Sequence, residues 1–229
     1  MKTIPLPELF ETLSSKGQLK QQVYKNAIEA IRLFKEVVTE IYEGYLQSDL
    51  RHPEVRFEYT DVNDFEVDMT FAGDVLVFIM HTNVFEFSRN HEVMNTPYVR
   101  EDKNRSYCGV IHIYNFLSDS YTYQRDNDLG YLIGRIFINK DNYFFIEGKR
   151  EVGMLYSGFG TQVLNKETAA EIVKSAMLYS INFDLLTPPF DDVKMVSVGQ
   201  VKAAYNSLSI TTGKRLGFKF QADTNGGHS

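Results

Sequence analysis

The stretch from residue 18 to residue 47 constrains the fold more than any other part of the chain, because one apolar pattern runs through all of it. Apolar residues recur at alternating steps of four and three, as they do on one face of an α-helix. A second apolar stripe runs beside the first, and the remaining polar stripe is narrow. The first stripe consists of Val23, Ala27, Ala30, Phe34, Val37 and Ile41, and the second of Tyr24, Ile28, Ile31, Val38, Tyr42 and Tyr45. The sequence therefore predicts a long helix that buries most of its circumference.

A helix of about 30 residues is ~45 Å long at 1.5 Å per residue, which is more than one small sheet needs to cover it. We therefore expect one stripe to pack on a sheet and the other to meet a different surface. A second copy of the same helix would provide that surface, since two-fold dimers are the commonest soluble assemblies. The C-terminal helix of the same chain is an equally simple alternative. Before residue 18, Pro5 and Pro7 predict a separate short helix that ends at Gly17.

Strand patterns begin after His52-Pro53, where the apolar period changes to two. Residues 55–60 and 65–71 alternate in polarity and predict an antiparallel hairpin with one wet face. Residues 75–80 are apolar at every position, which predicts a central strand covered on both faces. Further strand segments lie at 106–116 and 130–149, and Asn165 is placed to cap a helix from Lys166 to about Ile181.

The predicted fold class is α+β. We expect a single antiparallel sheet of about six or seven strands packed against a long N-terminal helix and a C-terminal helix. The main domain is predicted to span residues 1–187. A basic segment at 188–221 either packs on that domain or forms a small appendage, and residues 222–229 form a loose tail.

Charge is polarised along the chain, although the net charge is only −6. Residues 54–74 alone carry a net charge of −6, and residues 193–222 carry five basic residues and no acid. The single cysteine, Cys108, cannot form a disulfide within the chain. No apolar run approaches the roughly 20 residues that a membrane-spanning helix needs. From these features we expect a cytoplasmic protein without a membrane partner.

Glu147-Gly148-Lys149, at the end of an apolar strand, has the spacing of the acid and lysine in a metal-dependent nuclease site. The alternative is a structural ion pair. If residues 140–142 form a hairpin loop with Asn142 in the left-handed conformation, Arg135 faces Glu147 across the strands. The opposite face then carries only apolar residues and glycine, whereas a slip of one residue would mix the faces. This register favours the ion pair, because a nuclease would need a second acid beside Glu147 to share a cation.

Residues 88–106 show neither the helical nor the strand period, and a polar connection of this length is often either functional or disordered. Binding residues concentrate on such loops. The candidates for an anionic ligand or a partner protein are Arg89, Tyr98, Arg100, Lys103 and Arg105.

The basic C-terminal run loosely resembles a helix-turn-helix, with a predicted capping box at Ser197 to Gln200. Its candidate phosphate contacts are Lys202, Lys214, Arg215 and Lys219. The acidic net charge argues against nucleic acid, and the basic run could instead dock on the acidic hairpin at 54–74. His81, Glu86, His91 and Glu92 lack the helical spacing of a metal site. We therefore predict no metal and no cofactor.

Taken together, these patterns predict a non-catalytic ligand- or protein-binding module that forms a homodimer through residues 18–47. The first alternative is a nucleic-acid-binding protein that uses the basic C-terminal segment. The second is a divalent-metal nuclease that uses Glu147 and Lys149, with Arg135 beside them.

Overall fold

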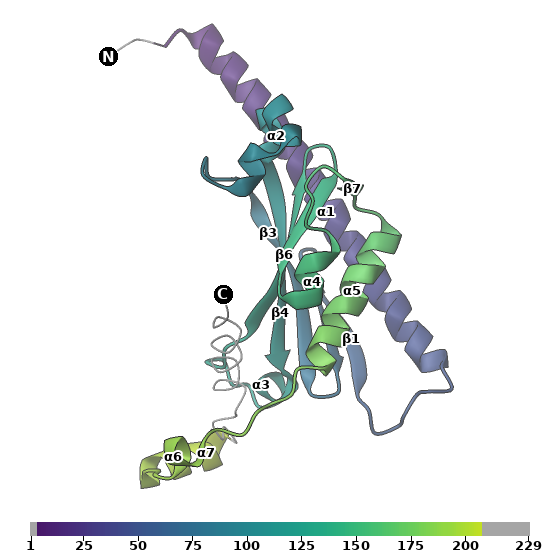
Figure 1. Ribbon diagram of the computed structural model, residues 1–229, viewed down its shortest axis with the longest axis vertical. Coiled ribbons are helices and arrows are strands. Elements are labelled where there is room, and N and C mark those ends of the chain that lie inside the picture. The colour runs from purple at the N-terminus through teal and green to yellow at the C-terminus, as the bar shows by residue number, and fades with distance from the viewer. Residues whose placement is uncertain (1–3, 208–229) are drawn as a thin grey trace, which may run out of the picture.

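The computed structural model describes residues 4–207, with the side chains of residues 150, 151, 154 and 203–207 left out. Its architecture is α+β, as predicted: one open sheet of seven strands, with a long N-terminal helix and a later helix on one face (Figure 1). Each strand pairs antiparallel with the strand that precedes it in the chain. The strands are β1 (Phe57–Asn63), β2 (Glu66–Phe71), β3 (Asp74–Glu86), β4 (Tyr107–Leu117), β5 (Tyr131–Asn139), β6 (Tyr143–Gly148) and β7 (Gln162–Val163).

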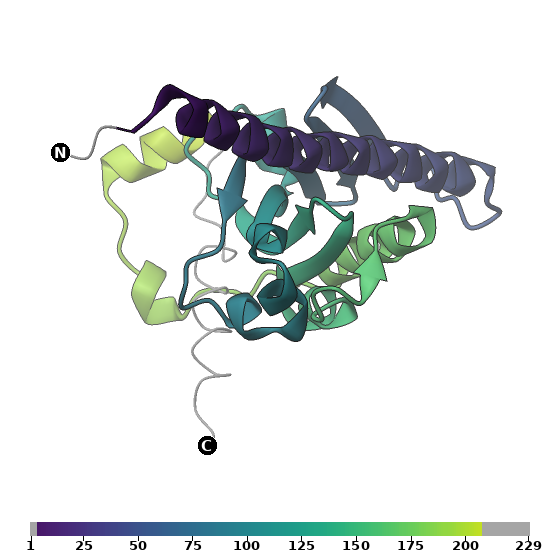
Figure 2. The same ribbon diagram turned by 90° about the horizontal axis from the view of Figure 1, so that it is seen from above.

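Two helices, α1 (Leu6–Gln47) and α5 (Lys166–Ile181), contact each other and cover the same face of the sheet. Figure 2 shows α1 crossing the molecule, and Figure 1 shows its N-terminal turns extending past the end of the sheet. The shorter helices are α2 (Pro97–Glu101), α3 (Ser118–Thr122), α4 (Arg150–Leu155), α6 (Phe190–Val193) and α7 (Val198–Ser207), with 3-10 turns η1 (Glu92–Asn95) and η2 (Lys103–Ser106). None of the described helices combines the length and the apolar character that crossing a membrane requires.

The first helix is continuous, so the prediction of a separate short helix ending at Gly17 is wrong. Gly17 lies inside α1 with nothing within 4 Å of the position its Cβ would occupy. A glycine inside a helix costs only about 1 kcal/mol relative to alanine, and helix propagation is cooperative. The favourable residues on both sides therefore carry the helix through this position.

Both apolar stripes of residues 18–47 are largely covered by the same chain. The residues of α1 that are fully or almost fully buried come from both stripes: Val23, Ala27, Ala30, Ile31, Phe34, Val37 and Val38. Close to the end of the helix, Tyr42 packs edge-on against Phe57 and Tyr59 of β1. This burial favours the alternative in which the sheet and α5, rather than a second copy, cover this segment.

The other face of the sheet has a smaller core of its own. Residues 88–106 fold into η1, α2 and η2, and they pack against the middle of the sheet. The buried members of this second core are Val93, Val99, Cys108, Val110, Phe137, Phe145 and Phe159. Strand β3 is buried on both sides over Val75 to Phe78, as the continuous apolar run predicts, although its residues are not members of this second core.

Candidate functional site

The β5–β6 hairpin has the register predicted from the separation of its faces. Asn142 adopts a left-handed conformation with φ 61°, and Arg135 lies directly opposite Glu147. The Arg135 guanidinium forms an ion pair with Oε2 of Glu147. The predicted register and the predicted ion pair between Arg135 and Glu147 are therefore confirmed.

His91, which the sequence does not connect to this pair, contacts the other carboxylate oxygen. Its Nε2 lies 3.1 Å from Oε1 of Glu147, while its Nδ1 accepts a hydrogen bond from the backbone N–H of Val93 at 3.2 Å. Because Nδ1 acts as an acceptor, the ring carries its proton on Nε2, and this N–H donates a hydrogen bond to Glu147. Both oxygens of the carboxylate are thus engaged within the protein.

The arrangement around Glu147 does not resemble a cation site. Lys149, its partner in the nuclease hypothesis, is the exposed residue that precedes α4. Asp128, an acid that precedes β5, accepts hydrogen bonds from Ser120 and Arg125, at 2.7 and 2.8 Å. Within the described side chains, no group of three or more His, Cys, Asp or Glu residues could hold a metal ion.

A small hollow of about 230 Å³ adjoins this cluster on the second face of the sheet. Its lining consists of Phe85, Glu86, Phe87, Ser88, His91, Cys108, Arg135, Phe137 and Glu147. Burial raises the pKa of the Cys108 thiol, so this cysteine is not a ready nucleophile. Burial also lowers the pKa of His112, on the same face, and the nearby Arg135 and His81 lower it further. The hollow is smaller than the pockets that hold most small-molecule ligands.

The predicted ligand-binding residues of the 88–106 connection fall into two groups. Tyr98 and Arg105 are engaged inside the protein, since both donate hydrogen bonds to Oδ2 of Asp141 at 3.1 Å. Burial raises the pKa of Tyr98 to about 12. Although burial alone would raise it, the pKa of Asp141 is held below its ordinary value by hydrogen bonds from Lys140, Tyr98 and Arg105. These contacts hold the connection to the β5–β6 turn.

The other three predicted ligand residues, Arg89, Arg100 and Lys103, are exposed. Arg100 donates a hydrogen bond of 3.4 Å to the side chain of Asn95. The five candidates are therefore divided between an internal hydrogen-bond network, which holds Tyr98 and Arg105, and the exposed surface, which carries the other three.

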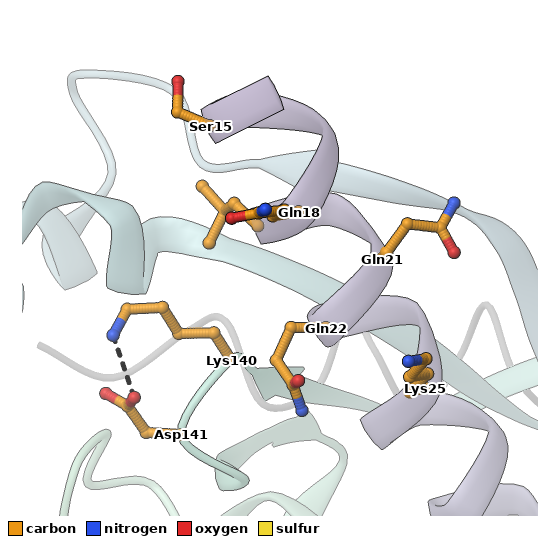
Figure 3. Close-up of a pocket in the computed structure, with 8 residues that line it drawn as sticks. Ser15, Gln18, Gln21, Gln22, Lys25, Lys140 and Asp141 are labelled. Atoms are coloured by element: carbon orange, nitrogen blue, oxygen red, sulfur yellow. Dashed lines mark hydrogen bonds and ion pairs between the residues drawn. The ribbon is translucent and has the colours of Figure 1, made fainter. Parts of the chain in front are cut away.

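An open groove of about 630 Å³ runs between α1 and the β5–β6 turn (Figure 3). Figure 3 shows Gln18 and Gln22 on one side, with Lys140 and Asp141 joined by an ion pair across from them. Beside the groove, Asn26 Nδ2 donates to the carbonyls of Asn139 and Lys140, at 2.8 and 3.0 Å. The groove is open and is lined almost entirely by residues with polar side chains, unlike the concave and mostly apolar sites that enclose small molecules.

One exposed apolar surface of the described chain lies on the first turns of α1. Leu6, Leu9, Phe10 and Leu13, here called the N-terminal apolar row, are 64%, 49%, 57% and 68% exposed. Their spacing of three and four residues places them along one side of the helix. Figure 1 shows these turns projecting beyond the sheet. The sequence reasoning missed this row because it assigned these residues to a separate short helix.

The predicted nucleic-acid contacts are only partly described. The capping box at the start of α7 is present, since Ser197 and Gln200 exchange backbone-to-side-chain hydrogen bonds of 2.8 and 3.1 Å. Lys202 is exposed on α7. Lys214, Arg215 and Lys219 lie outside the described residues, as does the predicted tail at 222–229.

Comparison with protein-family models, with curated proteins and with solved structures finds no match in any of the three.

Proposed function

We propose that this protein is a non-catalytic protein-binding module that self-associates through the first turns of its long N-terminal helix. The observation that carries this proposal is the N-terminal apolar row, which presents four large apolar side chains to solvent on a segment beyond the sheet. Single exposed apolar residues are ordinary on a soluble protein, whereas a continuous row on one element is typical of an interaction surface.

The row continues the face that α1 buries against its own sheet. Leu9 and Leu13 precede Ala27 and Ile31 by five full turns of 3.6 residues, so the four side chains point the same way. Ala27 and Ile31 are both fully buried. The apolar face of α1 extends beyond the described surface that covers it. We propose that a second molecule of the protein covers the N-terminal apolar row.

The proposed contact is centred on residues before the segment 18–47 that the sequence favours for a dimer. The buried residues of that segment already pack inside the chain, which supports moving the contact toward the helix start. We propose a cytoplasmic location, because the single cysteine of the chain, Cys108, is buried and cannot form a disulfide within the chain.

Charge substitutions in the row provide the test. We expect Phe10→Glu and Leu13→Glu to abolish self-association in sedimentation velocity, because each would bury a carboxylate in an apolar contact. Circular dichroism should stay unchanged, since both side chains are more than half exposed in the single chain.

Ser15→Glu is the matched control. Ser15 is exposed and lies two and a half turns after Leu6, on the opposite side of the helix, yet it receives the same charge. The control should sediment as the wild type does. If the wild type were a monomer, or if the control dissociated as fully as the row variants, the proposal would be refuted.

A further inference from the structure

We infer that two copies pair antiparallel through the N-terminal apolar row, with Leu13 near the two-fold axis and the helix start of each copy seated beside strand β3 of the other. This inference rests on the proposed self-association and specifies its geometry. It depends on three features of the described chain: the direction of the row, a notch at the end of the sheet and the position of Gly17.

The direction of the row excludes a parallel pair. Further along α1, the same side of the helix lies against the sheet, and the helix and strand β4 come very close together. A Cβ built at Gly109 of β4 would lie 2.5 Å from the Cβ of Ala27. Two parallel helices joined through this side would therefore bring both sheets into the same space. An antiparallel pair places the two sheets at opposite ends of the contact.

A notch lies where the row reaches the body of the protein. It is a hollow of about 290 Å³, lined by Lys20, Gln21 and Tyr24 of α1 and by Thr82, Asn83 and Val84 of β3. Tyr24 follows Leu6 by five full turns, so the notch lies on the side of the helix that carries the row. With Leu13 at the axis, Leu6 of the second copy falls opposite Lys20. The exposed Ile4 and Leu6 of that copy would then enter the notch.

Charge and backbone features agree with this register. Lys16 and Lys20 also lie near this side of α1, and a parallel pair would set each lysine against its own copy. In the antiparallel pair, Lys16 lies opposite Phe10 and can extend its apolar stem along the ring. Gly17 falls opposite Leu9, and a glycine there allows the two helices to approach closely. No contact within the described chain accounts for a glycine at this position.

Cross-linking of single-cysteine variants with a short bis-maleimide tests this geometry. The natural Cys108 is 1% exposed, so the introduced thiol is the one that reacts. Leu13→Cys should form a covalent dimer with itself. Leu6→Cys and Lys20→Cys should each stay monomeric on a denaturing gel when alone, and should form a dimer when mixed. Ser15→Cys, on the opposite side of the helix, is the control that should not react with itself.

The outcomes separate this inference from the proposed function. If the wild type sediments as a monomer, self-association itself fails. If the wild type is a dimer but Leu6→Cys links to itself and the mixture adds nothing, the antiparallel geometry is overturned while self-association stands. A dimer in which neither Leu13→Cys nor the mixture links also overturns the geometry, because the contact then lies elsewhere.

Discussion

At the scale of single residues, Asp68 on β2 is the least satisfied polar group in the described chain. Its Oδ1 is buried without a hydrogen-bond partner. Burial raises the pKa of this carboxyl to about 7, and the nearby Glu66 raises it further. A carboxyl whose pKa is raised in this way still holds its proton in the folded protein at pH values where the same carboxyl in the unfolded chain has lost it. Stability should therefore fall as the pH rises from about 4 to about 7, and then level off.

The Asp68→Asn variant should lose this pH dependence. Between pH 5 and pH 8 we expect the wild type to lose about 1 to 3 kcal/mol more unfolding free energy than the variant, which is the usual cost of a buried polar group without a partner. Urea denaturation at the two pH values measures the difference. Asp64→Asn, at an exposed turn position of the same hairpin, is the control. Equal pH dependence in the wild type and Asp68→Asn would contradict the role assigned to Asp68.

The sequence predicts one of the two side-chain contacts of Glu147 and not the other. Its pairing with Arg135 follows from the separation of apolar and polar faces, because side chains in a strand alternate with a strict period of two. The contact with His91 does not follow, since that residue is 56 positions away and its approach depends on how the 88–106 connection folds. Local periodicity carries no information about such a contact.

At the scale of elements, the packing of α1 on the sheet depends on small residues at the crossing point. Gly109 of β4 lies under Ala27, with no room for a methyl group. Gly109→Ala should lower the unfolding free energy by about 1 to 3 kcal/mol, as overpacked cores commonly do. Chemical denaturation monitored by circular dichroism measures this change.

Gly44→Ala is the matched comparison for Gly109→Ala. Gly44 is exposed inside α1, and nothing lies within 4 Å of its built Cβ. The same substitution should here raise the unfolding free energy by about 0.5 to 1 kcal/mol, because alanine is the better helix former. Changes of the same sign in the two variants would contradict the assignment of Gly109 to a close helix–sheet contact.

The elements that sequence reasoning predicts well are those with a long, regular pattern. The helix at 18–47, the strand at 75–80 and the Asn165 cap of α5 all appear where periodicity and capping chemistry place them. Local periodicity does not predict the folding of the 88–106 connection, because tertiary contacts of Val93 and Val99 with the sheet hold it in place. The sequence predicts a separate helix at the start of α1, but Gly17 does not end the helix, because one glycine costs too little to stop helix propagation.

At the scale of the whole molecule, the sheet is an unbroken meander in which every strand pairs with its neighbours in sequence. Short turns join β1 to β2, β2 to β3 and β5 to β6, whereas the connections from β3 to β4, from β4 to β5 and from β6 to β7 are longer and contain helical turns. The sheet and α5 account for the burial of α1 from Val23 onward, and they leave its first turns uncovered by described residues. The binding surface we propose is thus the first turns of α1, which project beyond the sheet.

Sedimentation equilibrium of the unmodified protein, over concentrations from micromolar to near millimolar, tests this most directly. A single chain has a mass of 26.4 kDa. We predict that the weight-average mass rises with concentration toward twice that value, because the exposed row should pair with a second copy. A mass that stays at 26.4 kDa over the whole range would contradict self-association through α1.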